Sequence, residues 1–139
     1  MPNIEAVAAA IFEAAQTEIL PRFRNLRAHE IKEKSPGDLV TIADLETEQT
    51  LNGALSELLP GSVLVGEEAV AQNPKLLQAL QTEPICWLVD PIDGTINFAH
   101  GVPLFATMVA LVIEGKTVCS LSLIHISEPT RRTPISYAV

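Results

Sequence analysis

Two carboxylates follow the end of an apolar stretch in the segment WLVDPIDGTINF, residues 87–98. Asp90 closes the apolar stretch, and Asp93 follows three residues later, directly before Gly94 and Thr95. A carboxylate at the end of a buried strand loses hydration, so it needs a cation or several hydrogen-bond donors to remain charged. A hard divalent cation relieves the repulsion between two such groups, and Mg²⁺ favours carboxylates together with water and phosphate oxygens. The pattern therefore predicts a Mg²⁺ site at this strand end.

The backbone around the two aspartates can contribute to the same site. The carbonyl of Ile92 can face a cation, because a chain that leaves a strand has carbonyl groups without ladder partners. Gly94 permits a tight turn, and the amides of Gly94 and Thr95 can open a short helix and hold phosphate. The simpler interpretation of an isolated D-x-x-D-G pattern is a hairpin turn at Asp93 with Asp90 at a surface strand end, and it stays open on this segment alone.

Two further apolar stretches end in acidic residues. Glu67 and Glu68 close the strand-like segment 62–68, and Asp44 follows another short apolar strand. If segment 62–68 lies beside segment 85–90, one of the two glutamates can reach the same cation. Taken separately, a pair of glutamates is usually a solvated surface feature, and an aspartate in such a position is usually a helix N-cap. Three acidic strand ends in one chain favour a shared site at a sheet edge, where open sheets commonly bind ligands.

The elements that must position these residues follow from periodicity and turn residues. Apolar residues at helical spacing predict an amphipathic helix over residues 1–30, which Pro21 should kink or divide. A hairpin is expected over residues 31–42, followed by a helix that Asp44 caps and that ends before Pro60. Three further strands are expected over residues 62–68, 85–90 and 104–113, and another strand is expected to begin at residue 117 after a turn. A short helix is expected over residues 74–81.

Composition limits the class of protein. The chain has 139 residues, of which 47% are hydrophobic, enough for one domain with a core. Its formal net charge of -8 does not suit a nucleic-acid-binding protein, which needs basic patches. The longest apolar run, 102–113, is shorter than the roughly 20 residues of a membrane span, and no basic segment typical of a secretory signal opens the chain. We therefore expect a cytoplasmic protein that binds neither nucleic acid nor membranes.

The last nineteen residues need a separate interpretation. LSLIHISEPTR (121–131) and ISYAV (135–139) match, in one reading frame, the translation of a transposase-type adapter from sequencing libraries. We therefore expect residues 1–120 to be native and residues 121–139 to be a non-native tail, which is excluded from the argument about function. The alternative is a natural tail that matches the adapter by chance.

Three motifs together carry a resemblance to a known family. GEE (66–68) and WLVDPIDGTINF (87–98), preceded by DLVTIAD (38–44), resemble the inositol monophosphatase family of Mg²⁺-dependent, typically lithium-sensitive phosphatases. The resemblance covers residues 1–120 and implies an α+β fold: the N-terminal half of a layered αβαβα sandwich, with a mostly antiparallel sheet in this half. It also implies hydrolysis of a small phosphorylated metabolite, and family members are often homodimers.

The resemblance implies a role for each motif residue. The implied Mg²⁺ ligands are three carboxylates and one backbone carbonyl: Glu67, Asp90, Asp93 and Ile92. Thr95 and Asp44 would form a hydrogen-bonded pair that positions and deprotonates the attacking water. The amides of Gly94 and Thr95 would hold the phosphate, and Glu68 would lie behind the ligands or help to form a weaker metal site.

The sequence also departs from the family pattern. The family takes a further metal ligand and most substrate contacts from a later Trp-Asp motif, which does not occur before Ser120, and Trp87 is the only tryptophan. We therefore expect this chain to be nearly inactive and its intact parent to be a phosphoric monoester hydrolase. The family's hairpin often carries a lysine, and Lys32 and Lys34 both remain candidates for it. The alternative function is that of a non-catalytic relative that binds a phosphorylated metabolite or a protein partner, although binding alone would not need the water-activating pair.

Overall fold

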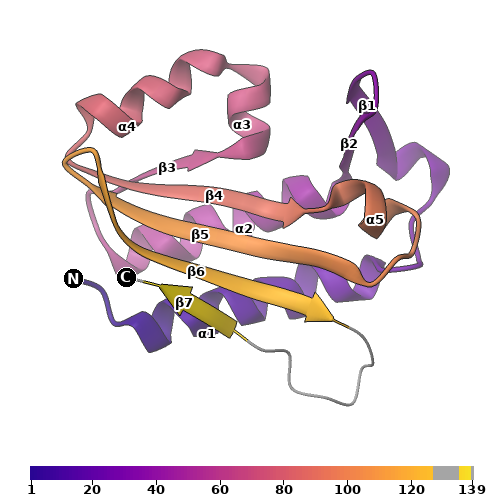
Figure 1. Cartoon of the computed structure of the whole chain (residues 1–139), viewed down its shortest axis with the longest axis horizontal. Coiled ribbons are helices and arrows are strands. Elements are labelled where there is room, and N and C mark those ends of the chain that lie inside the picture. Colours follow the sequence, from indigo (N-terminus) through magenta and orange to yellow (C-terminus); the bar gives the residue numbers. More distant parts are fainter. Residues whose placement is uncertain (127–134, 139) are drawn as a thin grey trace.

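The computed structural model describes residues 1–126 and 135–138, in which one sheet and a layer of helices form the body of the molecule (Figure 1). The five-stranded sheet has the order β3-β4-β5-β6-β7. Its strands are β3 (Val63–Gly66), β4 (Ile85–Asp93), β5 (Leu104–Ile113), β6 (Lys116–Ile126) and β7 (Ile135–Ala138). Only β3 and β4 pair in parallel, and the other three pairs are antiparallel. The predicted α+β fold with a mostly antiparallel sheet is thus confirmed.

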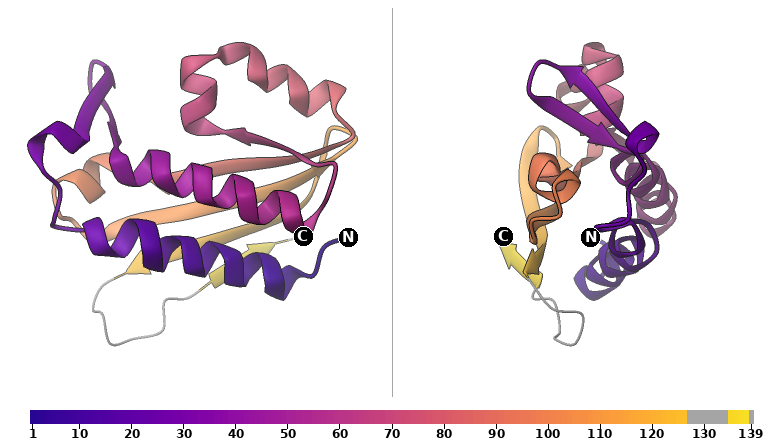
Figure 2. Two further views of the ribbon diagram at one scale, coloured as in Figure 1. Left: turned by 180° about the vertical axis from the view of Figure 1, so that it is seen from behind. Right: turned by 90° about the vertical axis from the view of Figure 1, so that its right-hand side faces the viewer.

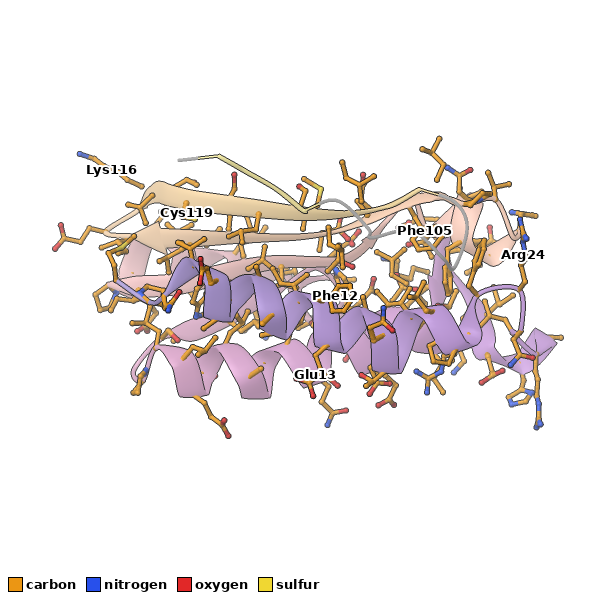
Figure 3. All side chains as sticks on the ribbon, turned by 90° about the horizontal axis from the view of Figure 1, so that it is seen from below. Phe12, Glu13, Arg24, Phe105, Lys116 and Cys119 are labelled. Carbon is orange, nitrogen blue, oxygen red and sulfur yellow. The ribbon has the colours of Figure 1, made fainter. Side chains whose placement is uncertain are left out.

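Two helices, α1 (Ile4–Ala14) and α2 (Ile42–Leu58), cover the same face of the sheet (Figure 2). Apolar side chains of both helices and of the three middle strands form the main core between these layers. Figure 3 shows this layer of side chains, with Cys119 and Phe105 toward its opposite ends. The alternation of a strand puts every second residue of β4 and β5 on the other face, where Leu88 and Met108 are exposed. One face of the sheet therefore holds the main core, while a smaller cluster of Val65, Cys86 and Val112 on the other face packs against Val70, Ala79 and Leu80.

The N-terminal helix ends earlier than the sequence predicts. After α1 the chain makes a π-helical turn over Ala15–Ile19 and a 3-10 turn over Leu20–Arg22, and then leaves the helical path. Pro21 lies in this last turn and has no amide proton with which to continue an α-helix. Arg24 then has a left-handed φ of 58°. Pro21 thus lies where the helical path ends and does not divide one helix into two parts, and the predicted helix beyond Arg22 is wrong apart from a 3-10 turn over Ala28–Glu30.

A hairpin of β1 (Ile31–Ser35) and β2 (Asp38–Thr41) forms a separate two-stranded sheet and runs directly into α2. The sequence predicts Asp44 as the N-cap of α2, but the N-cap is Thr41. The Thr41 hydroxyl accepts the amide proton of Asp44, while the Asp44 side chain accepts the amide proton of Thr41. Asp44 therefore occupies the third helical position of a capping box, where its side chain is also available to other elements.

Short helices connect the strands at both ends of the sheet. Between β3 and β4 lie α3 (Glu67–Gln72), a 3-10 turn (Pro74–Gln78) and α4 (Ala79–Thr82). The predicted helix over residues 74–81 is thus split between two helix types. At the other end, α5 (Thr95–Ala99) follows β4. Within the described residues, no helix has the length and hydropathy needed to cross a membrane.

The predicted start of the non-native tail falls inside β6. Ser120 pairs with Ala110 and Leu121 pairs with Val109, so the pairing with β5 continues across the proposed boundary. Residues 127–134 and 139 of the tail lie outside the described part of the chain. Strand pairing reports backbone geometry and not the origin of a sequence, so the adapter origin of residues 121–139 stays a prediction.

Candidate active site

Acidic residues from neighbouring strands meet at one end of the sheet. The parallel pairing of β3 with β4 places Gly66 opposite Val89, so Glu67, the first residue of α3, comes to lie beside Asp90. The sequence predicts that Asp90 ends its strand, but β4 continues past an irregularity to Asp93. A cleft of 440 Å³ lies at this place. Its wall consists of residues from β2, α3, β4 and α5: Asp38, Leu39, Glu67, Asp90, Ile92, Asp93, Gly94, Thr95, Ile96 and Asn97. The structure therefore brings all the predicted metal and phosphate residues into one cleft.

Asp90 is the most perturbed carboxyl of this cleft. Its Oδ1 atom is buried and accepts no hydrogen bond from the described residues. Burial raises the pKa of Asp90 well above its ordinary value, and the adjacent Glu67 and Asp93 carboxyls raise it further. A buried carboxyl oxygen without a donor, next to two other carboxyls, is the environment that a bound cation would stabilise.

The chemistry of the donor set fits a hard cation. Glu67, Asp90 and Asp93 offer carboxylate oxygens and Ile92 offers a carbonyl oxygen, the ligand types that Mg²⁺ prefers. Within residues 1–126 and 135–138, however, no three His, Cys, Asp or Glu side chains come close enough to hold a metal ion. The predicted ligands thus line one cleft, but their side chains are not gathered at coordinating distance.

The turn from β4 into α5 depends on Gly94. Its φ of 89° lies in the left-handed region, which side chains other than glycine rarely adopt. A Cβ atom at this position would also lie 3.0 Å from the carbonyl oxygen of Leu104. Gly94 accepts the amide proton of Phe98 through its own carbonyl, at 3.0 Å, and so starts α5 beside the cleft.

Replacing Gly94 by alanine is expected to destabilise the chain by about 1–3 kcal/mol, because the backbone strain is combined with the close contact to Leu104. The matched control is Gly61→Ala, since Gly61 has a similar φ of 86° and nothing within 4 Å of the added Cβ atom. Urea unfolding of both variants separates the cost of the left-handed backbone, which both share, from the cost of the contact with Leu104, which only Gly94→Ala makes. Equal losses of stability in the two variants would contradict a close approach at Gly94.

Asp44 and Thr95 form the predicted pair. The Thr95 hydroxyl lies 3.0 Å from Asp44 Oδ1 and 2.9 Å from the carbonyl oxygen of Ile92, so its single proton has two acceptors. The other oxygen of Asp44, Oδ2, accepts from the amide and the hydroxyl of Thr41, at 2.8 and 2.7 Å. Burial raises the pKa of Asp44, and the hydrogen bonds from Thr41 and Thr95 oppose this shift. Asp44 is therefore a buried acceptor in direct contact with a hydroxyl group on the cleft wall.

Glu68 does not line this cleft. Its carboxyl lies 3.3 Å from the ammonium group of Lys34 and is almost fully buried. Burial and the charge of Asp44 raise the pKa of Glu68 to about 7, while Lys34 lowers it. Lys34 also lies 3.9 Å from Glu67 and 3.9 Å from Asp38. Of the two candidate lysines, Lys34 is thus the one that reaches the acidic residues, and Lys32 is exposed.

Sequence reasoning missed Glu48. This residue of α2 is buried, and its two carboxylate oxygens accept the amide protons of Glu68 and Ala69 at 2.8 and 3.0 Å. A glutamate in a helical pattern normally indicates a solvated face. The available signal was its spacing: Glu48 follows Asp44 by one helical turn, so both side chains lie on the same face of α2.

Comparison with known proteins agrees with this geometry. A model of the inositol monophosphatase family matches residues 2–126. The inositol-1-monophosphatase SuhB of Mycobacterium tuberculosis is 34% identical over 118 residues, which are 84% of this chain and 40% of that protein. Inositol monophosphatase 1 of Bos taurus is 40% identical over 82 residues, which are 59% of this chain and 28% of that protein. The chain thus spans less than half the length of these relatives.

Solved structures show the same fold. The suppressor protein SuhB of Bartonella henselae superimposes with a TM-score of 0.69 at 27% identity, over 86% of this chain and 43% of its own. A Thermotoga maritima IMPase gives a TM-score of 0.71 at 19% identity, over 96% of this chain and 50% of its own, which supports the fold alone. Because the family model matches nearly the whole described chain, the chain belongs to the inositol monophosphatase family.

Proposed function

We propose that this chain supplies the water-activating part of a Mg²⁺-dependent phosphomonoesterase that acts on a small phosphorylated metabolite. One observation carries the proposal: the hydrogen-bonded Thr95 and Asp44 stand at a cleft whose other donors are carboxylate and carbonyl oxygens. A site that only bound a phosphorylated ligand would not need a buried carboxylate behind a hydroxyl group. Membership in a family of phosphatases supports the same reaction class.

The residues divide into a cation site and a phosphate site. Glu67, Asp90, Asp93 and the carbonyl of Ile92 would hold Mg²⁺. When bound, the ion would lower the pKa of a water molecule and offset charge on the phosphoryl group. The amides of Gly94 and Thr95, at the first turn of α5, would donate hydrogen bonds to phosphate oxygens.

The chain's own proton transfers then run through Thr95. The Thr95 oxygen accepts a hydrogen bond from the attacking water and takes its proton, while the Thr95 hydroxyl proton passes to Asp44 Oδ1, 3.0 Å away. The raised pKa of Asp44 makes its carboxylate a better proton acceptor than an exposed aspartate. The water oxygen forms the new bond to phosphorus, the ester bond breaks, and the leaving oxygen takes a proton from solvent.

The relatives suggest the substrate class. The Mycobacterium tuberculosis and Bos taurus proteins are named as inositol monophosphatases, so an inositol monophosphate is the first substrate to test. We further propose a cytoplasmic location and a homodimer for the complete enzyme. The alternative is a non-catalytic relative that binds a phosphorylated metabolite or a protein.

The deciding experiment compares the 139-residue chain with a chimera that joins its residues 1–120 to the C-terminal part of the Mycobacterium tuberculosis relative. Phosphate release from inositol 1-phosphate is measured with Mg²⁺ and with EDTA. We expect no steady release by the chain and Mg²⁺-dependent release by the chimera, because the chain spans only 40% of that relative.

The relative itself serves as the positive control, and the chimera with Asp93→Asn serves as the negative control. Steady release by the chain alone that Asp93→Asn abolishes would contradict the expected inactivity. Binding of inositol phosphate by a folded chimera without turnover would favour the non-catalytic alternative.

A further inference from the structure

We infer that Glu48 is a positioning residue: it fixes the start of α3 and thereby the place of Glu67 beside Asp90. The inference rests on the proposed function, because Glu67 is proposed there as a Mg²⁺ ligand, but the contacts that support it do not depend on that function. Glu48 Oε2 accepts the amide proton of Glu68 at 2.8 Å, and Oε1 accepts that of Ala69 at 3.0 Å. Each carboxylate oxygen thus holds one amide of the first turn of α3.

The start of α3 needs such an external partner. The first amides of a helix have no intrahelical acceptor, and a side chain at the N-cap usually supplies one. Here the N-cap is Gly66, which has no side chain. Glu48 reaches the same amides from α2, and its negative charge suits a helix N-terminus. The contact therefore joins α2, which carries Asp44, to α3, which carries Glu67.

Gly66 provides independent support for this contact. Its φ of -99° and ψ of 147° are extended and open to any residue, so the backbone does not require glycine. A Cβ atom at this position would, however, overlap the carboxylate of Glu48. Gly66 also pairs with Val89, the residue before Asp90. The glycine is therefore explained by the space that Glu48 occupies next to the strand pair that forms the cleft.

The consequence for the cleft follows from the chain path. Glu67 lies between Gly66 and Glu68 in the chain. The carboxylate of Glu48 covers Gly66 and accepts the amide proton of Glu68, so it contacts both neighbours of Glu67. A change at Glu48 must therefore alter the backbone on both sides of Glu67. Glu48→Gln keeps the volume of the side chain but removes its charge and replaces one acceptor by a donor, so it should loosen this turn without creating a cavity.

The test uses amide NMR spectra of the full 139-residue chain without metal, and then a titration with Mg²⁺ alone. In Glu48→Gln we expect the resonances of Glu68 and Ala69 to shift, and those of Glu67 and Asp90 to shift with them. Mg²⁺ affinity should fall about 10-fold, as for other residues that orient metal ligands. Shifts confined to Glu68 and Ala69, with Glu67 and Asp90 unchanged, would overturn the inference and leave Glu48 as a simple helix cap.

Asn3→Ala is the matched structural control, because Asn3 caps α1 with its side chain, which accepts from Glu5 and Ala6. It should lower the urea midpoint without moving the resonances of Glu67 and Asp90 or the Mg²⁺ affinity. If Asn3→Ala changes Mg²⁺ affinity as much as Glu48→Gln does, the effect is one of general stability and the inference fails.

A second pair of variants tests the same contact when Glu48→Gln does not fold. Gly66→Ala should displace Glu48 and shift the resonances of Glu67 and Asp90. The same substitution in a Glu48→Ala background should add little, because the new methyl group fills the space that the carboxylate left. Additive effects would overturn the inference.

Absence of any Mg²⁺ response in the wild-type chain would count against the proposed function, whereas the metal-free spectra still decide the role of Glu48.

Discussion

Asp90→Asn is expected to weaken Mg²⁺ binding by more than about 100-fold, since replacing even the outer partners of a metal ligand costs 10–100-fold. The same substitution should stabilise the metal-free chain. Among the described residues the buried Oδ1 atom of Asp90 has no donor, and burial together with the neighbouring Glu67 and Asp93 disfavours the charged form of Asp90. An asparagine of equal shape removes that charge, so we expect a gain of about 1 kcal/mol in the free energy of unfolding.

The gain should depend on pH with a definite sign. The pKa of Asp90 is raised in the folded chain, so the folded state keeps a proton that the unfolded state has already lost. Stability therefore falls as the pH rises from the ordinary aspartate value through the raised folded value. Asp90→Asn removes this penalty, so its advantage should be larger at about pH 8 than at about pH 5.

Urea unfolding at both pH values, with and without Mg²⁺, measures these effects. Asp38→Asn is the control, because Asp38 also lines the cleft but has an exposed side chain. It should change neither the metal-free stability nor its pH dependence to a comparable degree. A metal-free Asp90→Asn variant that is less stable than the wild type at about pH 8, or that keeps its affinity for Mg²⁺, would contradict the interpretation of Asp90 as a ligand.

The buried strand before Asp90 was predictable because a continuous apolar run indicates burial, and an acidic residue directly after such a run has few explanations. Its end was not predictable, since the pairing of β4 with β5 resumes at Asp93 after an irregularity. The parallel pairing of β3 with β4 then brings Glu67 to Asp90, as the sequence argument required. The pair of Asp44 and Thr95, by contrast, was implied by the resemblance to the inositol monophosphatase family and not by the strand pattern.

Other features depend on tertiary contacts that the residue types along the chain do not indicate. Thr41 and Asp44 are both good N-cap residues, and the sequence alone does not say which of them takes the cap. In the structure Thr41 takes it, while Asp44 also contacts Thr95 from another element. Glu48 bonds only to backbone amides, which every residue except proline carries, so no residue pattern marks its partners. The structure decides these cases through tertiary packing.

Thr95→Val is expected to lower the turnover of the chimera described above by about 100- to 10,000-fold, the usual contribution of a general base. Valine keeps the shape of threonine but has no hydroxyl, so water loses both its acceptor and its path to Asp44 Oδ1, which lies 3.0 Å from that hydroxyl. Mg²⁺ affinity should stay nearly unchanged, because the Thr95 side chain is not among the proposed ligands. The measurement is kcat for phosphate release together with a Mg²⁺ titration.

Thr95→Ser is the matched control, since it keeps the hydroxyl and should retain most of the turnover. Asp44→Asn should cost about as much as Thr95→Val, and the double variant should cost little more than either one, because the two residues act as one unit. Additive losses would mean that Asp44 and Thr95 contribute separately. An active Thr95→Val enzyme would show that the water loses its proton to another group, and the 3.0 Å hydrogen bond would then serve only to hold β4 and α5 against α2.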